Sequence, residues 1–276
     1  MRPPPGTEDL PVREALPDLL ASLRETPNAV LVAPPGAGKT TLVPLALLDA
    51  GWCERIVILE PRRIAARAAA SRMAALLGER VGETVGLRVR LETRISAATR
   101  IEVVTEGVFA RMIGDDPALE GVSAVLLDEF HERSLDADLA LALALDAQGA
   151  LRPDLRLVAM SATLDGARVA ELMDAPVIRS EGRAFPVEIV HRERRADERI
   201  EDAMAAAIRG ELGGGSILAF LPGQREIERT LERLDLPPPW TPCPFTARCH
   251  RASRTPPSDR PTPHAWCLPP PSPRPR

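Results

Sequence analysis

The residues that decide the fold are Ala33–Thr41, with the sequence APPGAGKTT, and the apolar run Ala29–Ala33 that leads into them. Gly36 and Gly38 allow the backbone to turn sharply, so that its N–H groups can converge on one point. A glycine-rich turn between a strand and a helix is typical of phosphate-binding loops, because the helix adds its N-terminal dipole. The alternative is an ordinary glycine-rich turn without a ligand.

The pattern assigns a role to each polar residue of this loop. Lys39, the only lysine among 35 basic residues, would reach the β- and γ-phosphates of a triphosphate. The Thr40 hydroxyl would bind Mg²⁺. Ala33 stands where the usual pattern begins with glycine. The residues expected to bind ATP are Gly36, Ala37, Gly38, Lys39, Thr40 and Thr41.

Around this loop, short aliphatic runs alternate with helical patterns. The expected strands are Ala29–Ala33, Ile56–Leu59, Ile101–Val104, Ala124–Asp128, Leu155–Ser161, Val177–Ser180 and Val187–Val190. The expected helices are Ile64–Leu77, Gly107–Ile113, Leu135–Ala147 and Gly166–Met173. Near-continuous Val, Ile and Leu runs separated by helices indicate a parallel sheet covered on both faces. We therefore predict a doubly wound α/β fold.

A second α/β unit is expected to begin where SEGRAFP interrupts the pattern near residue 180. A helix over Asp197–Leu212 carries Ile200, Met204 and Ile208 on one face, and Ser216–Leu221 follows as a buried strand. We expect three parts: residues 1–180, residues 181–236 as the incomplete second unit, and residues 237–276 as a tail.

The tail differs from the rest in composition. It holds 14 of the 29 prolines, and Leu268 is its only Val, Ile, Leu or Met. So few aliphatic residues can hardly offset the entropy of ordering, so we expect disorder. A proline-rich docking segment is the alternative. No structural zinc is expected, because the spacing does not suit zinc ligands; the residues considered are Cys243, Cys249, His250, His264 and Cys267.

Charge and hydropathy limit the function classes. The formal net charge is −4, so nucleic-acid binding through bulk charge is disfavoured, although a local basic groove is not excluded. Neither a signal peptide nor an apolar run long enough to span a bilayer is present, so we expect a cytoplasmic protein without a membrane partner.

A second chemical motif is VLLDEFH, Val125–His131. A carboxylate that ends a buried parallel strand lies at the carboxyl edge of the sheet, beside the phosphate loop. There Asp128 can hold Mg²⁺ and Glu129 can orient or deprotonate an attacking water, as phosphoryl transfer requires. Alone, such an acidic pair can simply cap a helix.

Five motifs in this order resemble the DEAH-box helicases of superfamily 2, and their spelling most resembles the bacterial HrpB-like branch. They are APPGAGKTT, LEPRRIAARAAA, VVTEGVFARM, LLDEFHERSLDADLALALAL and AMSATLDG. The resemblance runs from about residue 10 to residue 236. Phe130 stands where the family name has alanine, but the HrpB-like branch itself reads DEFH. The resemblance implies a RecA-like P-loop domain followed by an incomplete second RecA-like domain.

The same resemblance implies roles at the nucleotide. Lys39 and Thr40 would bind the phosphates and Mg²⁺, Asp128 the metal, and Glu129 the water, while His131 would connect the site to the second domain. The candidate catalytic residues are Lys39, Asp128, Glu129 and His131. Ser161 and Thr163 would couple hydrolysis to domain movement.

For nucleic acid, the resemblance implies backbone contacts to a single strand, RNA rather than DNA. The residues implied are Arg62, Arg63, Thr105 and Gly107, and Arg67 or Arg72 would stack on adenine. The four arginines can instead form a solvated helix face. Phe220 and Gln224 resemble the helicase motif that opens the second domain, or they simply end a strand and begin a helix.

Two motifs of the family's second domain, ATxxAETS and the arginine-finger motif QRxGRxGR, are absent from the sequence as written. Read one base earlier, the codons of Leu268–Arg276 can spell ATSIAETS. We therefore hypothesise a truncation by a frameshift near Pro237–Pro239, which the gene sequence tests. Two functions stay open: an active ATP-dependent helicase, or an ATP- and nucleic-acid-binding fragment with little hydrolysis or unwinding. A nucleotide kinase is disfavoured by the SAT and DEFH sequences together.

Overall fold

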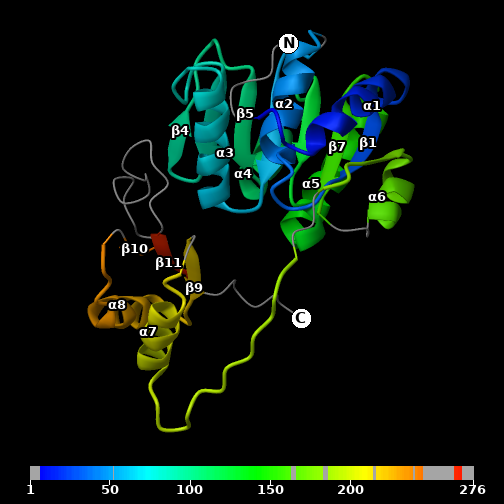
Figure 1. Ribbon diagram of the computed structural model, residues 1–276. Coiled ribbons are helices and arrows are strands. Elements are labelled where there is room, and N and C mark those ends of the chain that lie inside the picture. Colours follow the sequence, from blue (N-terminus) through cyan, green and yellow to red (C-terminus); the bar gives the residue numbers. More distant parts are fainter. Residues whose placement is uncertain are drawn as a thin grey trace. The chain divides into compact units, whose positions relative to one another are not determined.

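The computed structural model describes residues 7–51, 53–162, 166–182, 186–213, 216–238, 240–244 and 264–268 (Figure 1). The chain divides into two compact units, Met1–Phe185 and Pro186–Arg276, which are treated separately below. Among the predicted site residues, Thr163 lies outside the described residues.

The first unit is built on one sheet of eight strands in the order β4-β3-β5-β2-β6-β7-β1-β8. The strands are β1 Asn28–Val32, β2 Ile56–Glu60, β3 Val85–Val89, β4 Glu92–Arg94, β5 Ile101–Thr105, β6 Ala124–Leu127, β7 Arg156–Ser161 and β8 Val177–Arg179. All neighbouring pairs are parallel except β3 and β4, which form a hairpin.

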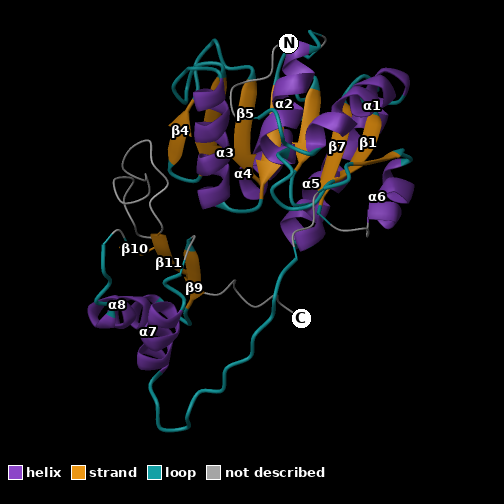
Figure 2. Ribbon diagram, viewed as in Figure 1, coloured by secondary structure: helices purple, strands orange, loops and turns teal. Residues whose placement is uncertain are grey.

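Helices cover both faces of this sheet (Figure 2). They are α1 Val12–Glu25, α2 Lys39–Asp49, α3 Arg63–Leu76, α4 Glu106–Asp115, α5 Leu135–Ala150 and α6 Gly166–Met173, with a 3₁₀ turn, η1, at Phe130–Glu132. Because side chains alternate along a strand, Ala29 and Leu31 of β1 pack with α1–α3, whereas Val30 and Val32 pack with α4–α6. The doubly wound α/β prediction is confirmed.

Parallel strands bring the motifs of the sequence to one edge. The loops after β1, β2, β5, β6 and β7 all leave the carboxyl edge of the sheet, and they carry APPGAGKTT, PRR, TEG, DEFH and SAT respectively. Stretches that lie far apart along the chain therefore meet in space, as expected for ligand sites of open α/β sheets.

The second unit contains α7 Ile200–Gly210, β9 Ile217–Phe220, α8 Gln224–Arg233, β10 Thr241–Pro244 and β11 His264–Leu268. Its three strands are parallel, in the order β10-β11-β9. A small core gathers Ile208 of α7, Ala219 of β9 and Ile227 of α8, together with Leu221. Phe220 ends β9 and Gln224 begins α8, which fits either reading of that motif.

Two short strands lie within the residues that the sequence predicts to be a disordered tail. Thr241–Pro244 and His264–Leu268 lie in residues 237–276, yet they pair in the second sheet. The second of them contains Ala265–Leu268, four consecutive apolar residues, and a strand with a neighbour on each side satisfies its backbone groups. Cys249 and His250 lie outside the described residues.

One expected strand is wrong and one hairpin was not expected. Val187–Val190 is an extended loop, with Val187 81% and Ile189 76% exposed. No strand within the described ranges pairs with it, so it lacks the partner that a strand requires. In contrast, β3 and β4 do pair, although their arginines and glutamates hide the apolar alternation.

Candidate nucleotide and nucleic-acid sites

The phosphate-loop residues form a tight turn between β1, which is fully buried, and α2. Gly36 and Gly38 have φ angles of 77° and 90°, the left-handed region that glycine enters without strain. A Cβ on Gly38 would lie 2.8 Å from Leu10 Cδ1. The loop is also anchored to α1, because Val12 N donates to Ala37 O at 3.1 Å.

Lys39 is the first residue of α2, and it is only 3% exposed. Its Nζ lies 2.9 Å from Glu129 Oε1, so the predicted phosphate-binding lysine directly contacts the predicted water-activating carboxylate. These residues are 90 positions apart in the sequence. The fold thus brings the two side chains together, and their membership of one nucleotide site stays a prediction.

Thr40 and Asp128 supply the oxygen atoms expected for Mg²⁺. Thr40 Oγ1 donates to Asp128 Oδ2, and Glu129 N donates to Asp128 Oδ1 at 2.8 Å. A hydroxyl and a carboxylate beside a phosphate loop are hard oxygen donors, which suit Mg²⁺. The residues present therefore fit this ion.

Sequence reasoning missed a third carboxyl group in the site, that of Glu60 at the end of β2. Burial, together with the nearby carboxyl groups of Asp128 and Glu129, raises its pKa to about 9, and the positive charge of Lys39 opposes this shift. The pKa of Asp128 is also raised by burial, against the hydrogen bond from Thr40. The available signal was a glutamate directly before Pro61 at the end of an apolar run.

The DEFH turn adopts strained backbone geometry. Glu129 has a φ of 49°, which is rare for a residue with a side chain and costs about 1–3 kcal/mol. Its Oε2 lies 3.4 Å from His131 Nδ1, and the same nitrogen accepts a hydrogen bond from Ala162 N at 3.3 Å. His131 therefore joins the DEFH turn to the SAT segment. Ser161, at the end of β7, accepts from Ala33 N through its backbone oxygen at 3.0 Å.

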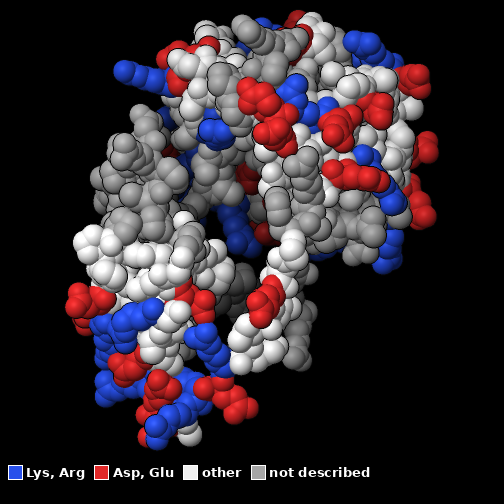
Figure 3. Space-filling view, in the orientation of Figure 1, with Lys and Arg blue, Asp and Glu red and all other residues white. Residues whose placement is uncertain are grey.

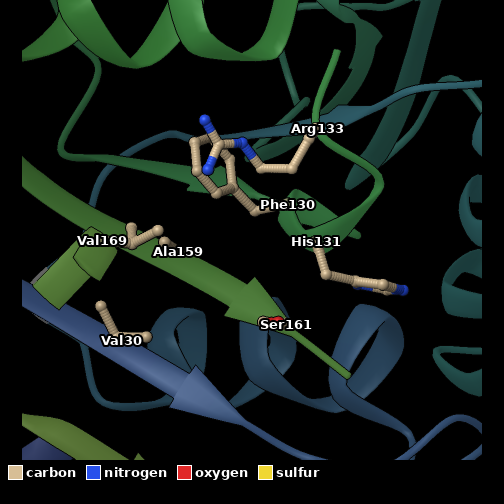
Figure 4. Close-up of a pocket in the computed structure, with 7 residues that line it drawn as sticks. All are labelled: Val30, Phe130, His131, Arg133, Ala159, Ser161 and Val169. Carbon is tan, nitrogen blue, oxygen red and sulfur yellow. The ribbon is translucent and has the colours of Figure 1, made fainter. Parts of the chain in front are cut away.

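Phe130 anchors this turn in the apolar core. It is 4% exposed and lines a small cavity of about 30 Å³. The other lining residues are Val30, His131, Arg133, Ala159, Ser161 and Val169. Figure 4 shows Ser161 at the end of its strand, and the His131 ring directed away from Phe130. The phenylalanine thus packs beneath the site, while the His131 ring lies against Glu129 and Ala162.

The predicted nucleic-acid residues do not all line one surface. Thr105 and Gly107, at the start of α4, line a groove of about 940 Å³. Four arginines line the same groove: Arg55, Arg88, Arg90 and Arg111. Sequence reasoning missed them, although Arg111 lies one helical turn after Gly107 and so on the same face. Arg62, in the loop after β2, and Arg63, the first residue of α3, are exposed and lie outside this groove.

The arginines proposed for adenine differ in their contacts. Arg67 Nε lies 2.6 Å from Glu92 Oε2, so this guanidinium already has a carboxylate partner. Arg72 is exposed and makes no ion pair with the described residues. Of the two, only Arg72 offers an uncommitted guanidinium to a base.

The distribution of charge on the described residues of the first unit shows no extended basic face in the view of Figure 3. On the face of the first unit that Figure 3 displays, acidic and basic side chains are intermingled. None of the helices in the described part of the chain is long and apolar enough to cross a membrane.

Known proteins are similar to this chain in sequence and in fold. The family model for DEAD/DEAH box helicases matches residues 13–172. The ATP-dependent RNA helicase HrpB of Escherichia coli K12 is 53% identical over 229 residues, which is 82% of this chain and 28% of that protein. A crystal structure of the Escherichia coli DEAH/RHA helicase HrpB covers 94% of this chain, and the chain covers 34% of it, with 47% identity and a TM-score of 0.86. A second structure, of the E. coli DExH-box NTPase HrpB, gives 46% identity and a TM-score of 0.75, with 95% of this chain and 33% of that chain covered.

Proposed function

Because this chain belongs to the DEAD/DEAH box helicase family, we propose that it binds Mg-ATP in the loop Ala33–Thr41. We further propose that it binds single-stranded RNA through residues that follow β2 and β5 at the same carboxyl edge of the sheet. The contact of Lys39 with Glu129, beside the pair formed by Thr40 and Asp128, carries the first proposal. It gathers a phosphate cradle, a metal site and a base within one cluster, which are the parts that phosphoryl transfer needs.

The side chains of the cluster divide the work. A γ-phosphate that binds Lys39 takes the place of the Glu129 carboxylate, which then becomes available to orient a water and accept its proton. Thr40 and Asp128 would hold Mg²⁺, which neutralises charge on the phosphates when bound. The N–H groups of the loop and the first turn of α2 would bind the phosphate oxygens.

His131 is suited to report on this exchange. Its Nδ1 contacts both Glu129 and the backbone N–H of Ala162, so a movement of Glu129 reaches the segment that contains Ser161 and Thr163. We propose that this contact couples the nucleotide to domain movement.

RNA is proposed as the strand because the relative with 53% identity is named an RNA helicase. Thr105, Gly107, Arg62 and Arg63 would contact its phosphates, which binds a strand without reading its sequence. Arg90 and Arg111 add guanidinium groups beside Thr105 and Gly107 in the groove, and neither has an ion-pair partner within the described residues. Asp115 and Asp116 line the groove too, so the four arginines leave a small positive excess, which can bind a strand locally even on an acidic protein.

A second candidate function concerns the 276 residues by themselves. They contain no QRxGRxGR sequence, and arginine fingers are worth roughly 10³–10⁵ in rate in related enzymes. We therefore propose that this chain alone binds ATP and RNA but hydrolyses ATP slowly. The chain spans 28% of the length of the curated relative, and we do not propose unwinding for these 276 residues by themselves.

The two candidates differ in one assay. Steady-state ATP hydrolysis is measured with and without single-stranded oligouridylate. The binding-only proposal expects slow turnover that RNA barely changes, and robust RNA-stimulated turnover would replace it with the active helicase. A DNA oligomer of the same length, compared in the same assay, tests the choice of RNA.

A further inference from the structure

The turn that carries Glu129 is held by both loops proposed to bind nucleic acid. In the loop after β2, Arg62 Nη2 lies 3.0 Å and 3.1 Å from the two carboxylate oxygens of Glu132. After β5, where α4 begins, Glu106 Oε2 accepts a hydrogen bond from Ser134 Oγ at 2.8 Å. Glu132 directly follows the DEFH residues, and Ser134 lies two positions further on, at the N-cap of α5. Each of the two segments thus has its own contact to the stretch that follows DEFH.

The turn itself transmits these contacts to the nucleotide site. Glu132 N donates to Glu129 O at 2.8 Å, which ties the residue that contacts Arg62 to the residue that contacts Lys39. Glu129 and Arg133 both have a φ of 49°. Such strained residues persist only where surrounding contacts hold them, and Glu132 links this turn to Arg62.

The Arg62–Glu132 pair is open to exchange. The Arg62 side chain is 59% exposed and that of Glu132 is 34% exposed, and an ion pair in such a setting contributes little to stability. A phosphodiester oxygen offers the same guanidinium an equivalent acceptor. The Arg62 guanidinium is thus accessible to solvent, and the Glu132 carboxylate occupies the place that a phosphate of the nucleic acid would take.

We propose that Glu132 is a positioning residue, which competes with the nucleic-acid backbone for Arg62 and links strand binding to the placement of Glu129. When a phosphate binds Arg62, the Glu132 carboxylate is released, and the contact from the loop after β2 to the DEFH turn is lost. This inference rests on the proposed function in one respect, that Arg62 binds a strand.

The first test measures binding of a fluorescently labelled oligouridylate by anisotropy in the absence of nucleotide. Glu132→Gln removes the competing charge, so we expect about two- to fivefold tighter binding, the range that corresponds to an exposed ion pair. Asp138→Asn is the matched control, because Asp138 pairs with Arg133 at 3.2 Å and not with Arg62. It removes the same charge nearby, so it should change the affinity less than Glu132→Gln. In an Arg62→Ala background, Glu132→Gln should have no effect.

The outcomes separate the two proposals. If Arg62→Ala binds the strand as tightly as the parent protein, the proposed function of Arg62 is wrong, and the inference goes with it. If Arg62→Ala weakens binding but Glu132→Gln matches Asp138→Asn, only the competition is overturned.

A second measurement tests whether Glu132 links strand binding to the nucleotide site. If Glu132 had only a structural role, its substitution would not change the effect of the strand on nucleotide affinity. The affinity for a fluorescent ATP analogue is compared with and without saturating oligouridylate. We expect the strand to change this affinity in the parent protein and in Asp138→Asn, but not in Glu132→Gln. An equal response in all three proteins would contradict the link.

Discussion

Glu60→Gln isolates the energetic consequence of placing a third carboxyl group in the nucleotide site. Glu60 is 2% exposed at the end of β2. Burial, with Asp128 and Glu129 close by, raises its pKa from the ordinary 4.5 to about 9. Glutamine keeps the shape and a hydrogen-bond donor toward Asp128, but it has no proton to lose. The substitution therefore removes the titration and little else.

The direction of the effect follows from proton binding. Because the pKa is raised in the folded protein, the native state keeps a proton that the unfolded chain releases above pH 4.5. The stabilisation from this group is complete below pH 4.5 and is lost as the pH rises toward 9. Each pH unit within this window lowers the free energy of unfolding by about 1.4 kcal/mol. Between about pH 5.5 and 8.5, the loss from Glu60 is about 4 kcal/mol.

The assay is urea unfolding followed by circular dichroism, with EDTA present, for the parent protein and Glu60→Gln. The free energy of unfolding of the variant minus that of the parent should grow by about 4 kcal/mol from about pH 5.5 to 8.5. Glu60 and Asp128 affect each other's proton binding, so the difference reports the titration of Glu60 as a member of this pair. A difference that stays constant across this range would refute the raised pKa of Glu60.

Two other substitutions probe the backbone and the packing of the same site. Gly38→Ala should lower the melting temperature more than Gly36→Ala: both positions have positive φ, costing about 1–3 kcal/mol, but only a Cβ at Gly38 meets Leu10, at 2.8 Å. Equal melting temperatures for the two variants would contradict this reason. Phe130→Ala should lower the free energy of unfolding by about 3–5 kcal/mol, because the ring is 4% exposed in the core. Its affinity for Mg-ATP should fall less than that of Lys39→Ala, because Phe130 packs beneath the site and contributes no group that binds the phosphates. Urea unfolding and nucleotide titration check both statements.

Structural features that depend on neighbouring residues of the chain could be predicted from the sequence. APPGAGKTT encodes its own turn, since glycines occupy the two positions with positive φ, and apolar runs of Val, Ile and Leu marked most strands of the first sheet. The meeting of Lys39 with Glu129 also follows, because parallel strands bring their carboxyl ends to one edge.

The contacts that depend on strand register or on side-chain partners could not be predicted in this way. Glu60 joins the site because β2 lies beside β6, with Leu59 opposite Leu127, and the sequence does not state that order. Arg67 was a candidate for adenine until the unpredicted strand β4 supplied Glu92 as its partner. For the same reason, the pairing of Arg62 with Glu132 has no local signature.

The tail shows the limit of composition as a guide. Fourteen prolines predicted a segment without structure, but His264–Leu268 pairs with β9 and Thr241–Pro244 pairs with His264–Leu268. Val187–Val190 shows the converse, because its apolar residues suggested a strand for which the described residues supply no partner. In both cases the outcome depends on a neighbouring strand, which composition does not reveal.

The assignment of the nucleotide site can be decided by titrating Mg-ATP into the chain and into Lys39→Ala. Lys39 Nζ contacts only Glu129 among the described residues, and it is the single lysine of the chain. We expect the parent protein to bind Mg-ATP, and the variant to lose this binding while it retains its circular dichroism spectrum. Equal affinity of the folded variant and the parent would mean that the phosphates bind elsewhere.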